Sequence, residues 1–250
     1  MTEQGASIKK GKRVRILGAP VDCVTMSETL DRLDGFVKAG GPHLIITADS
    51  SGLVQAQTDA ELRGLYDSAA LVTPDSNGVV WAMNRKGCPQ TERVSGVDIA
   101  DRVCALSAER GYRIFFLGGE PGVAEAAAEK MRQKYPGCNI VGARHGYFKP
   151  DQDREVATEV APAKPDFLFV GMGIPRQEKF IRTTMDIVKA PVAIGVGGSL
   201  DVFSGKAKRA PVLIQRIKLE WLWRTALNPS KISKAKLLPR FVLLVLRERS

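Results

Sequence analysis

The chain has 250 residues, of which 44% are hydrophobic and 26% are charged, and its formal net charge at pH 7 is +10. This length and apolar content favour a globular protein with a sizeable core, in one large or two small domains. No apolar run reaches the ~18 residues of a membrane-spanning helix, and the polar first residues predict that no signal peptide is present.

The positive charge is concentrated at the end of the chain. From Lys206 onward twelve lysines and arginines face two acids, whereas residues 1–205 carry 25 residues of each sign. This split predicts a neutral α/β body, residues 1–205, and a basic appendage, residues 206–250. An appendage of this charge favours an acidic partner.

Cysteines and histidines give little sign of a metal site or a disulfide framework. Cys23, Cys88, Cys104 and Cys138 stand far apart, without a C-x-x-C pair, and the chain has only two histidines. We therefore expect reduced, mostly buried thiols in a cytoplasmic protein.

The first half of the chain alternates apolar runs with amphipathic stretches. Short apolar runs predict strands at 13–17, 43–47 and 69–72. Amphipathic stretches predict helices at about 25–38, 52–57, 60–68 and from 79 onward. Thr25 and Glu28 have the spacing of a capping box, which marks the start of the first helix.

The second half repeats this alternation from about residue 94. Strands are expected at 112–117, 139–142, 167–170 and 192–196. Helices are expected at 98–110, 123–135, 153–159 and from 175 onward. Strands that alternate with helices predict a Rossmann-like α/β fold, with a mostly parallel sheet and helices on both faces.

Polar or glycine-rich loops follow five of these strands, at Thr47, Asp75, Gly118, Gly171 and Gly197. In parallel sheets, ligands bind beyond the carboxyl ends of the strands. We therefore expect these loops to share one ligand crevice.

One of these loops is especially informative, in the stretch FLFVGMGIPRQEKF at 167–180. Gly171 and Gly173 let the backbone approach a ligand closely, and Pro175 suits the first turn of a helix. A strand, a glycine loop and a helix N-terminus together can bind an anion, because the first N–H groups of the helix are unpaired. The alternative is an ordinary connection between strand and helix.

Familiar nucleotide motifs are absent. The chain has no G-x-G-x-x-G followed by an acid about 20 residues later and no P-loop, which argues against a nicotinamide dehydrogenase and a P-loop enzyme. Asp151 and Asp153 form a D-x-D, but within a polar, charged stretch. We interpret this as a solvated helix start rather than a metal site.

Asp75 is the strongest candidate for a catalytic residue. It lies in the turn-forming stretch 73–78 directly after an expected strand. A carboxylate held rigidly there could take a proton from an attacking hydroxyl. The alternative is that it caps the helix beginning at Val79, but Asn77 could serve as that cap and so free Asp75.

Several motifs together resemble one family. They are TPDxxGVVW from Thr73, GMGIPRQE from Gly171, GVGG from Gly195, FxG from Phe203, RAP from Arg209, EWLxR from Glu220, and Pro229. The chain resembles the WecG/TagA/CpsF glycosyltransferases (glycosyltransferase family 26) from about Arg15 to Phe241. This resemblance implies an inverting enzyme that moves a sugar from a UDP-sugar to a polyprenyl-diphosphate-linked saccharide in the synthesis of cell-surface polysaccharide.

The resemblance implies catalytic roles for Asp75 as the general base, Gln177 and Arg224. Because the D-x-D at Asp151 and Asp153 is expected away from the crevice, we expect the reaction to need no metal or other cofactor. Substrate contacts are expected at the strand ends, from Thr47, Asp49, Asn77, Gly118, Gly119, Gly171, Gly173, Arg176, Gly197 and Gly198. The helix starts after Gly119 and Gly173 would stabilise the leaving UDP together with Arg224.

Departures from the family pattern leave the donor open. Asp49 stands where the family usually has Asn, Ser76 where it often has Gly, and Lys231 where Arg is common. The sugar could be N-acetylmannosamine, glucuronic acid or another hexose.

The appendage predicts two short amphipathic helices, at 212–223 and 237–246, flanked by cations. Such helices can lie on an anionic leaflet, so we expect a peripheral protein on the inner face of the cell membrane. The alternative is a C-terminal helix packed on the core with a solvated basic face. A nucleic-acid-binding protein is the rival class, supported by the basic tail with Trp221 and Trp223 but not by the neutral body.

Overall fold

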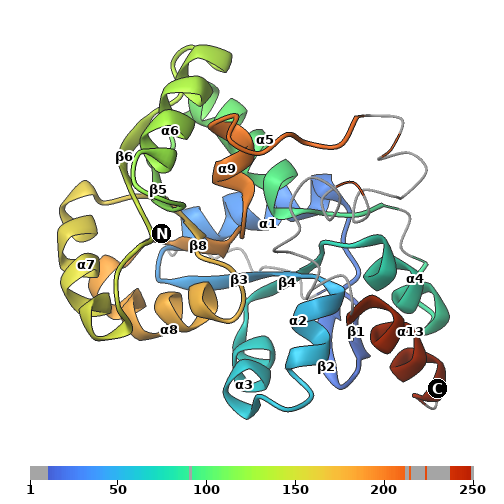
Figure 1. Cartoon of the computed structure of the whole chain (residues 1–250). Helices are drawn as coiled ribbons and strands as arrows, with labels where there is room; N and C mark the ends of the chain where they lie inside the picture. Colours follow the sequence, from blue (N-terminus) through green and yellow to red (C-terminus); the bar gives the residue numbers. More distant parts are fainter. Residues whose placement is uncertain (1–10, 90–91, 212–213, 215–222, 224–236, 249–250) are drawn as a thin grey trace, which may run out of the picture.

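The computed structural model describes residues 11–89, 92–211, 214, 223 and 237–248 (Figure 1). Its centre is a six-stranded sheet in which every pair of neighbours is parallel. The strands in spatial order are β4 (Leu71–Pro74), β3 (His43–Ala48), β8 (Val192–Gly195), β7 (Phe167–Gly171), β5 (Ile114–Gly118) and β6 (Ile140–Arg144). The expected α/β fold is confirmed.

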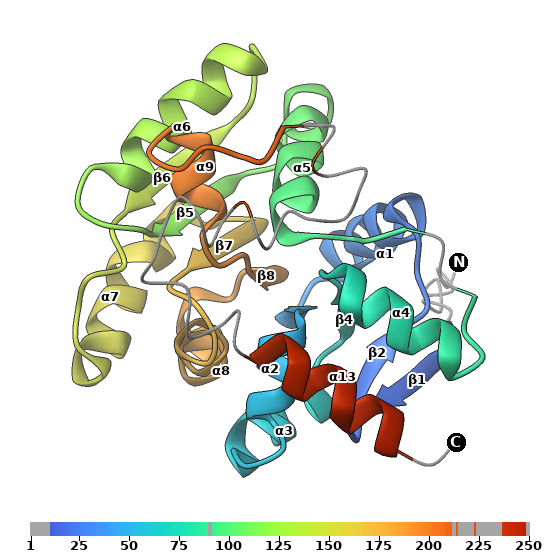
Figure 2. The same cartoon turned by 45° about the vertical axis from the view of Figure 1, so that its right-hand side comes forward.

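Helices cover both faces of this sheet (Figures 1 and 2). One face carries α1 (Met26–Ala39), α5 (Gly96–Arg110), α6 (Val123–Lys134) and α9 (Ser199–Phe203). The other carries α2 (Ser50–Gln55), α3 (Ala60–Ser68), α4 (Asn77–Arg85), α7 (Asp153–Val160), α8 (Arg176–Val188) and α13 (Leu237–Arg247). Short 3-10 turns at Pro150–Gln152 and Ala161–Ala163 flank α7.

Alternation along the strands explains the two layers of helices. In β7, Leu168 and Val170 enter one hydrophobic core, whereas Phe167 and Phe169 enter the other. Successive side chains of a strand point to opposite faces, so a fully apolar strand must be covered on both sides.

A small antiparallel hairpin precedes the main sheet, formed by β1 (Arg13–Ile16) and β2 (Ala19–Asp22). The sequence predicts a single strand here, at 13–17, so β2 was missed. Leu17 and Gly18 both have positive φ, which suits a two-residue hairpin turn. Buried Asp22 then accepts the N–H of Val72 at 2.7 Å, which joins the hairpin to β4.

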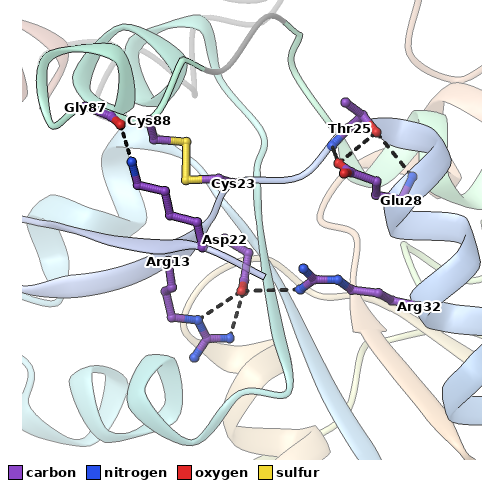
Figure 3. The surroundings of a disulfide bond; sticks show 9 residues. Arg13, Asp22, Cys23, Thr25, Glu28, Arg32, Gly87 and Cys88 are labelled. Atoms are coloured by element: carbon purple, nitrogen blue, oxygen red, sulfur yellow. Dashed lines mark hydrogen bonds and ion pairs between the residues drawn. A yellow bond between two sulfur atoms is a disulfide. The ribbon is translucent and has the colours of Figure 1, made fainter. Parts of the chain in front are cut away.

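Figure 3 shows a disulfide between Cys23, just after β2, and Cys88, just after α4, with their Cα atoms 6.2 Å apart. The expectation of four reduced thiols is wrong for this pair. The fold brings together two cysteines that are 65 positions apart in the sequence, which spacing alone does not reveal. Cys104 and Cys138 are free and buried, as expected.

The C-terminal helix α13 packs on the body beside α2 and α4 (Figure 2). Phe241 and Val245 are buried in the core, whereas Leu243 and Leu246 are 55% and 52% exposed. Just beyond the helix, Glu248 accepts the N–H of Leu17 at 3.1 Å. The expected helix at 212–223 lies outside the described residues, apart from Ile214 and Trp223, so the boundary at residue 205 stays a prediction.

Among the helices in the described ranges, none has the length and apolar character needed to cross a bilayer.

Candidate active site

The parallel sheet brings the carboxyl ends of β4, β3, β8, β7 and β5 to one edge, as the sequence predicts. The loops at the last three strands are in backbone contact. A β-carbon built on Gly118 would collide with the carbonyl oxygen of Gly171, and one built on Gly171 would lie 2.7 Å from the carbonyl oxygen of Gly197. Gly119 N–H donates to that Gly171 oxygen at 3.1 Å. The glycines that were predicted to contact substrate therefore also allow these loops to pack closely against one another.

The side chain of Gln177 joins the loops after β7 and β8 by hydrogen bonds. Its side-chain oxygen accepts the N–H of Gly173 and the N–H of Gly197, both at 3.0 Å. Its side-chain nitrogen donates to Oε1 of Glu178 at 2.7 Å. The Gln177 residue is only 1% exposed, so the structure places this expected catalytic residue inside the protein, under the loops.

Thr47 and Asp49, both expected to contact substrate, are engaged within the protein. Thr47 is buried, and its hydroxyl donates to the carbonyl oxygen of Gly195 at 2.8 Å. Asp49 caps α2, where Oδ1 accepts the N–H of Gly52 at 2.6 Å and the hydroxyl of Ser51 at 2.8 Å. Both side chains therefore shape the start of the loop after β3.

Asp75 follows β4 and is half-buried, and its backbone N–H donates to the carbonyl oxygen of Ala48 at 2.9 Å. The cap of α4 is Ser76, whose hydroxyl accepts the N–H of Val79 at 3.2 Å. The expectation that Asn77 caps this helix is wrong, because Asn77 is already its first residue. Ser76 rather than Asp75 therefore caps α4.

Sequence reasoning missed Tyr66, an apolar-face residue of α3. Its hydroxyl is fully buried and has no hydrogen-bond partner among the described residues. Burial, and then the carboxylates of Asp49, Glu178 and Asp75, raise the pKa of this phenol well above its ordinary value. The phenol therefore keeps its proton next to the acidic groups of the site.

Arg176, expected to bind substrate, instead pairs with Asp153. Two hydrogen bonds join the guanidinium to both carboxylate oxygens, and the Nη1–Oδ2 distance is 2.8 Å. The same guanidinium stacks over Phe148 and Phe180. The D-x-D was predicted to be a solvated helix start. Asp153 is indeed the first residue of α7, but it is only 8% exposed, so the prediction that it is solvated is wrong.

The helices that follow Gly119 and Gly173 begin at the same edge. Neither α6, capped by Gly122, nor α8, capped by Pro175, has a side-chain hydrogen bond to its first N–H groups. In contrast, α1 to α5 all have such a bond. The starts of α6 and α8 thus lack side-chain caps, while the N–H groups of Val123 and Gln177 donate to the carbonyl oxygens of Glu120 and Gly173, both at 3.0 Å. An anion at these helix starts would be received by the other N–H groups of the first turns.

The first basic residues of the appendage are held at the rim of this edge. Lys206 pairs with Glu120, in the loop after β5, and Arg209 pairs with Asp98 of α5 at 2.6 Å. Tyr147, which is 64% exposed, directs its hydroxyl to the same Glu120 at 3.3 Å. Arg224, the remaining expected catalytic residue, lies outside the described residues.

Within the ranges that the structure describes, no group of three or more His, Cys, Asp or Glu side chains is arranged to hold a metal ion.

Comparison with known proteins gives consistent matches. The sequence model of the "Glycosyl transferase WecG/TagA/CpsF family" matches residues 14–250. Relatives from Staphylococcus aureus strains NCTC 8325 / PS 47, COL and N315 are each 32% identical over 232 residues, which cover 92% of this chain and 91% of the relative. Each relative is named N-acetylglucosaminyldiphosphoundecaprenol N-acetyl-beta-D-mannosaminyltransferase.

Proposed function

Since this chain belongs to the WecG/TagA/CpsF family of glycosyl transferases, we propose that it moves a sugar from a UDP-sugar to a polyprenyl-diphosphate-linked saccharide, with inversion at the anomeric carbon. The observation that carries the proposal is the position of Asp75. It stands at the carboxyl edge of the sheet, and Ser76 rather than Asp75 caps the following helix.

In the proposed reaction, the acceptor hydroxyl gives its proton to Asp75 as its oxygen attacks the anomeric carbon of the donor. The bond from that carbon to the diphosphate oxygen breaks, and UDP leaves with the bonding electron pair. A single displacement of this kind inverts the anomeric configuration. The base needs a fixed position, which the hydrogen bond from Asp75 N–H to Ala48 supplies.

Negative charge grows on the diphosphate as the bond breaks. The starts of α6 and α8, which lack side-chain caps, can offer N–H groups and the positive end of the helix dipole to it. Arg224 would add a full positive charge, as the family resemblance implies. We propose that these groups together suffice without a divalent metal.

The acceptor is proposed from the relatives, whose printed name describes a sugar linked through diphosphate to undecaprenol. A lipid of this kind stays in a bilayer. The exposed Leu243 and Leu246 of α13, with the cations of the appendage, support a peripheral position on the inner face of the cell membrane.

The donor sugar is best found by testing a panel of UDP-sugars with a polyprenyl-diphosphate-linked acceptor, with and without anionic liposomes. We expect transfer from one of them, with UDP-N-acetylmannosamine and UDP-glucuronic acid as first candidates. The absence of UDP release and of transfer with every donor would contradict the proposed function. Filter binding to DNA across a salt series, run beside liposome sedimentation, would separate it from the nucleic-acid alternative.

A further inference from the structure

Two consecutive residues in the first turn of α8, Gln177 and Glu178, are both buried, at 1% and 0% exposure. Adjacent side chains on a helix point in different directions, so the burial of both requires cover on more than one side. Here both face inward beneath the loops after β7 and β8. A buried carboxylate next to a buried amide is costly unless the two are well bonded.

The hydrogen bonds require one orientation of the Gln177 amide. A side-chain amide has an oxygen that only accepts and a nitrogen that only donates. Two donors, the N–H groups of Gly173 and Gly197, face one end of the group, and an acceptor, Oε1 of Glu178, faces the other. Turning the amide over would set its NH₂ against two N–H groups and its oxygen against the carboxyl group.

Glycine at position 195 leaves room for this pair. A β-carbon built there would collide with Nε2 of Gln177 and lie 2.9 Å from Oε1 of Glu178. The φ angle of Gly195 is outside the positive range, so space rather than backbone conformation requires glycine. Strand β8 is thus packed directly onto the bonded amide and carboxyl group.

We propose that Glu178 is a positioning residue for this site. It orients the Gln177 amide, and the amide holds the glycine loops after β7 and β8 at a fixed separation. This inference rests on the proposed function in one respect, namely that these loops bind the diphosphate of the donor. Glu178 itself stays beneath the loops and contacts no reacting atom.

The test is Glu178→Gln, which keeps the size of the side chain but lets it present either oxygen or NH₂ to Gln177. The first measurement needs no substrate: the backbone amide ¹H shifts and hydrogen exchange of Gly173 and Gly197. We expect upfield shifts and exchange about 10-fold faster or more at both glycines, because their acceptor is no longer held. The control, Glu155→Gln on the exposed side of α7, should change neither.

The second measurement is kinetic. Glu178→Gln should raise the donor KM and lower kcat/KM by about 10-fold or more, since misplaced loops lose donor contacts. Unchanged glycine amides together with wild-type kinetics would overturn the inference. If the wild-type protein uses no UDP-sugar, the proposed function fails, and the NMR measurement still decides the role of Glu178.

A wild-type measurement covers the case in which Glu178→Gln does not fold. The side-chain NH₂ of Gln177 should be strongly protected from exchange. Gln133 is a suitable reference, because it bonds Glu129 at 2.9 Å on the exposed surface of α6. Equal exchange of the two NH₂ groups would show that Gln177 is not held by a buried carboxyl group and would overturn the inference.

Discussion

A β-carbon built on Gly78 would lie 3.5 Å from Cε1 of Phe241. The C-terminal helix therefore packs at ordinary contact distance against the first turn of α4, close to Asp75. Leu238 of the C-terminal helix lies 3.6 Å from the same point. The β-carbon would collide instead with Oγ of Ser50, at 2.6 Å, so Ser50 rather than Phe241 calls for glycine at position 78. Helix α13 thus lies beside the stretch that carries Asp75, at the proposed catalytic edge.

The two faces of α13 should have separable effects. Phe241→Ala should lower the free energy of unfolding by about 3–5 kcal/mol, the usual cost of emptying a core position of this size. Leu243→Glu with Leu246→Glu should leave the unfolding midpoint almost unchanged and reduce sedimentation with anionic liposomes, because these side chains are exposed. Tyr147→Ser, at another exposed hydrophobic side chain, is the control and should bind liposomes normally. Liposome binding that survives both glutamates would exclude α13 as the docking face.

Because α13 is part of the core, removing the whole appendage would disturb the body as well. A cut after Gly205 would remove Phe241 and Val245 from the core, so it is expected to destabilise the body as well as to abolish docking. Point variants keep these effects apart. Arg224→Ala is the corresponding change for the leaving group, and it should slow transfer while liposome binding persists, since one charge among twelve contributes little to docking.

Gly195→Ala probes the packing beneath the glycine loops. The added methyl group would displace the Gln177 amide from its position, so transfer should fall by about 10²-fold, as small misplacements in active sites can cause. Gly64→Ala is a matched control, because nothing lies within 4 Å of a β-carbon at that helical position. Transfer rates from purified, folded variants decide the matter, and wild-type activity in Gly195→Ala would contradict the account.

The disulfide can be tested by counting thiols. Denatured protein prepared without reductant should react with a thiol reagent at two cysteines, Cys104 and Cys138, and at four after reduction. Because the bond closes a loop of 65 positions, reduction should lower the free energy of unfolding by ~4 kcal/mol in the chain-entropy treatment. Four reactive thiols before reduction would show that the bond is not formed.

Metal dependence is the next test. Transfer should persist in EDTA, because helix N-termini and Arg224 are proposed to stabilise the leaving UDP. Measuring the rate before chelation, in EDTA and after adding manganese would settle this point. A rate that vanishes in EDTA and returns with manganese would overturn the metal-independent mechanism.

Much of the fold follows from local pattern, since buried parallel strands such as 167–170 are continuous apolar runs with glycine loops after them. Strand β2 of the hairpin could not be predicted in this way, because its first residues, Ala19 and Pro20, are typical of a turn. Its residues are buried by the main sheet, which the local sequence does not describe.

Side-chain partners were harder to predict than strand ends. The pairs Asp153 with Arg176 and Cys23 with Cys88 join positions that are brought together only by helix packing and by the hairpin. The burial of Gln177 is similar, since its partners include a loop 20 positions away. Residue type and spacing placed these groups near the crevice, but only three-dimensional packing shows which of them face it.

The most direct test of the proposed function is the transfer rate of Asp75→Asn with the preferred UDP-sugar and a polyprenyl-diphosphate-linked acceptor. The substitution preserves the shape of the side chain and removes its ability to take a proton. UDP binding should be unchanged, and transfer should fall by ~10²–10⁴-fold, whereas Asp151→Asn on an exposed turn should behave as wild type. Transfer at the wild-type rate by Asp75→Asn would remove this residue from the mechanism.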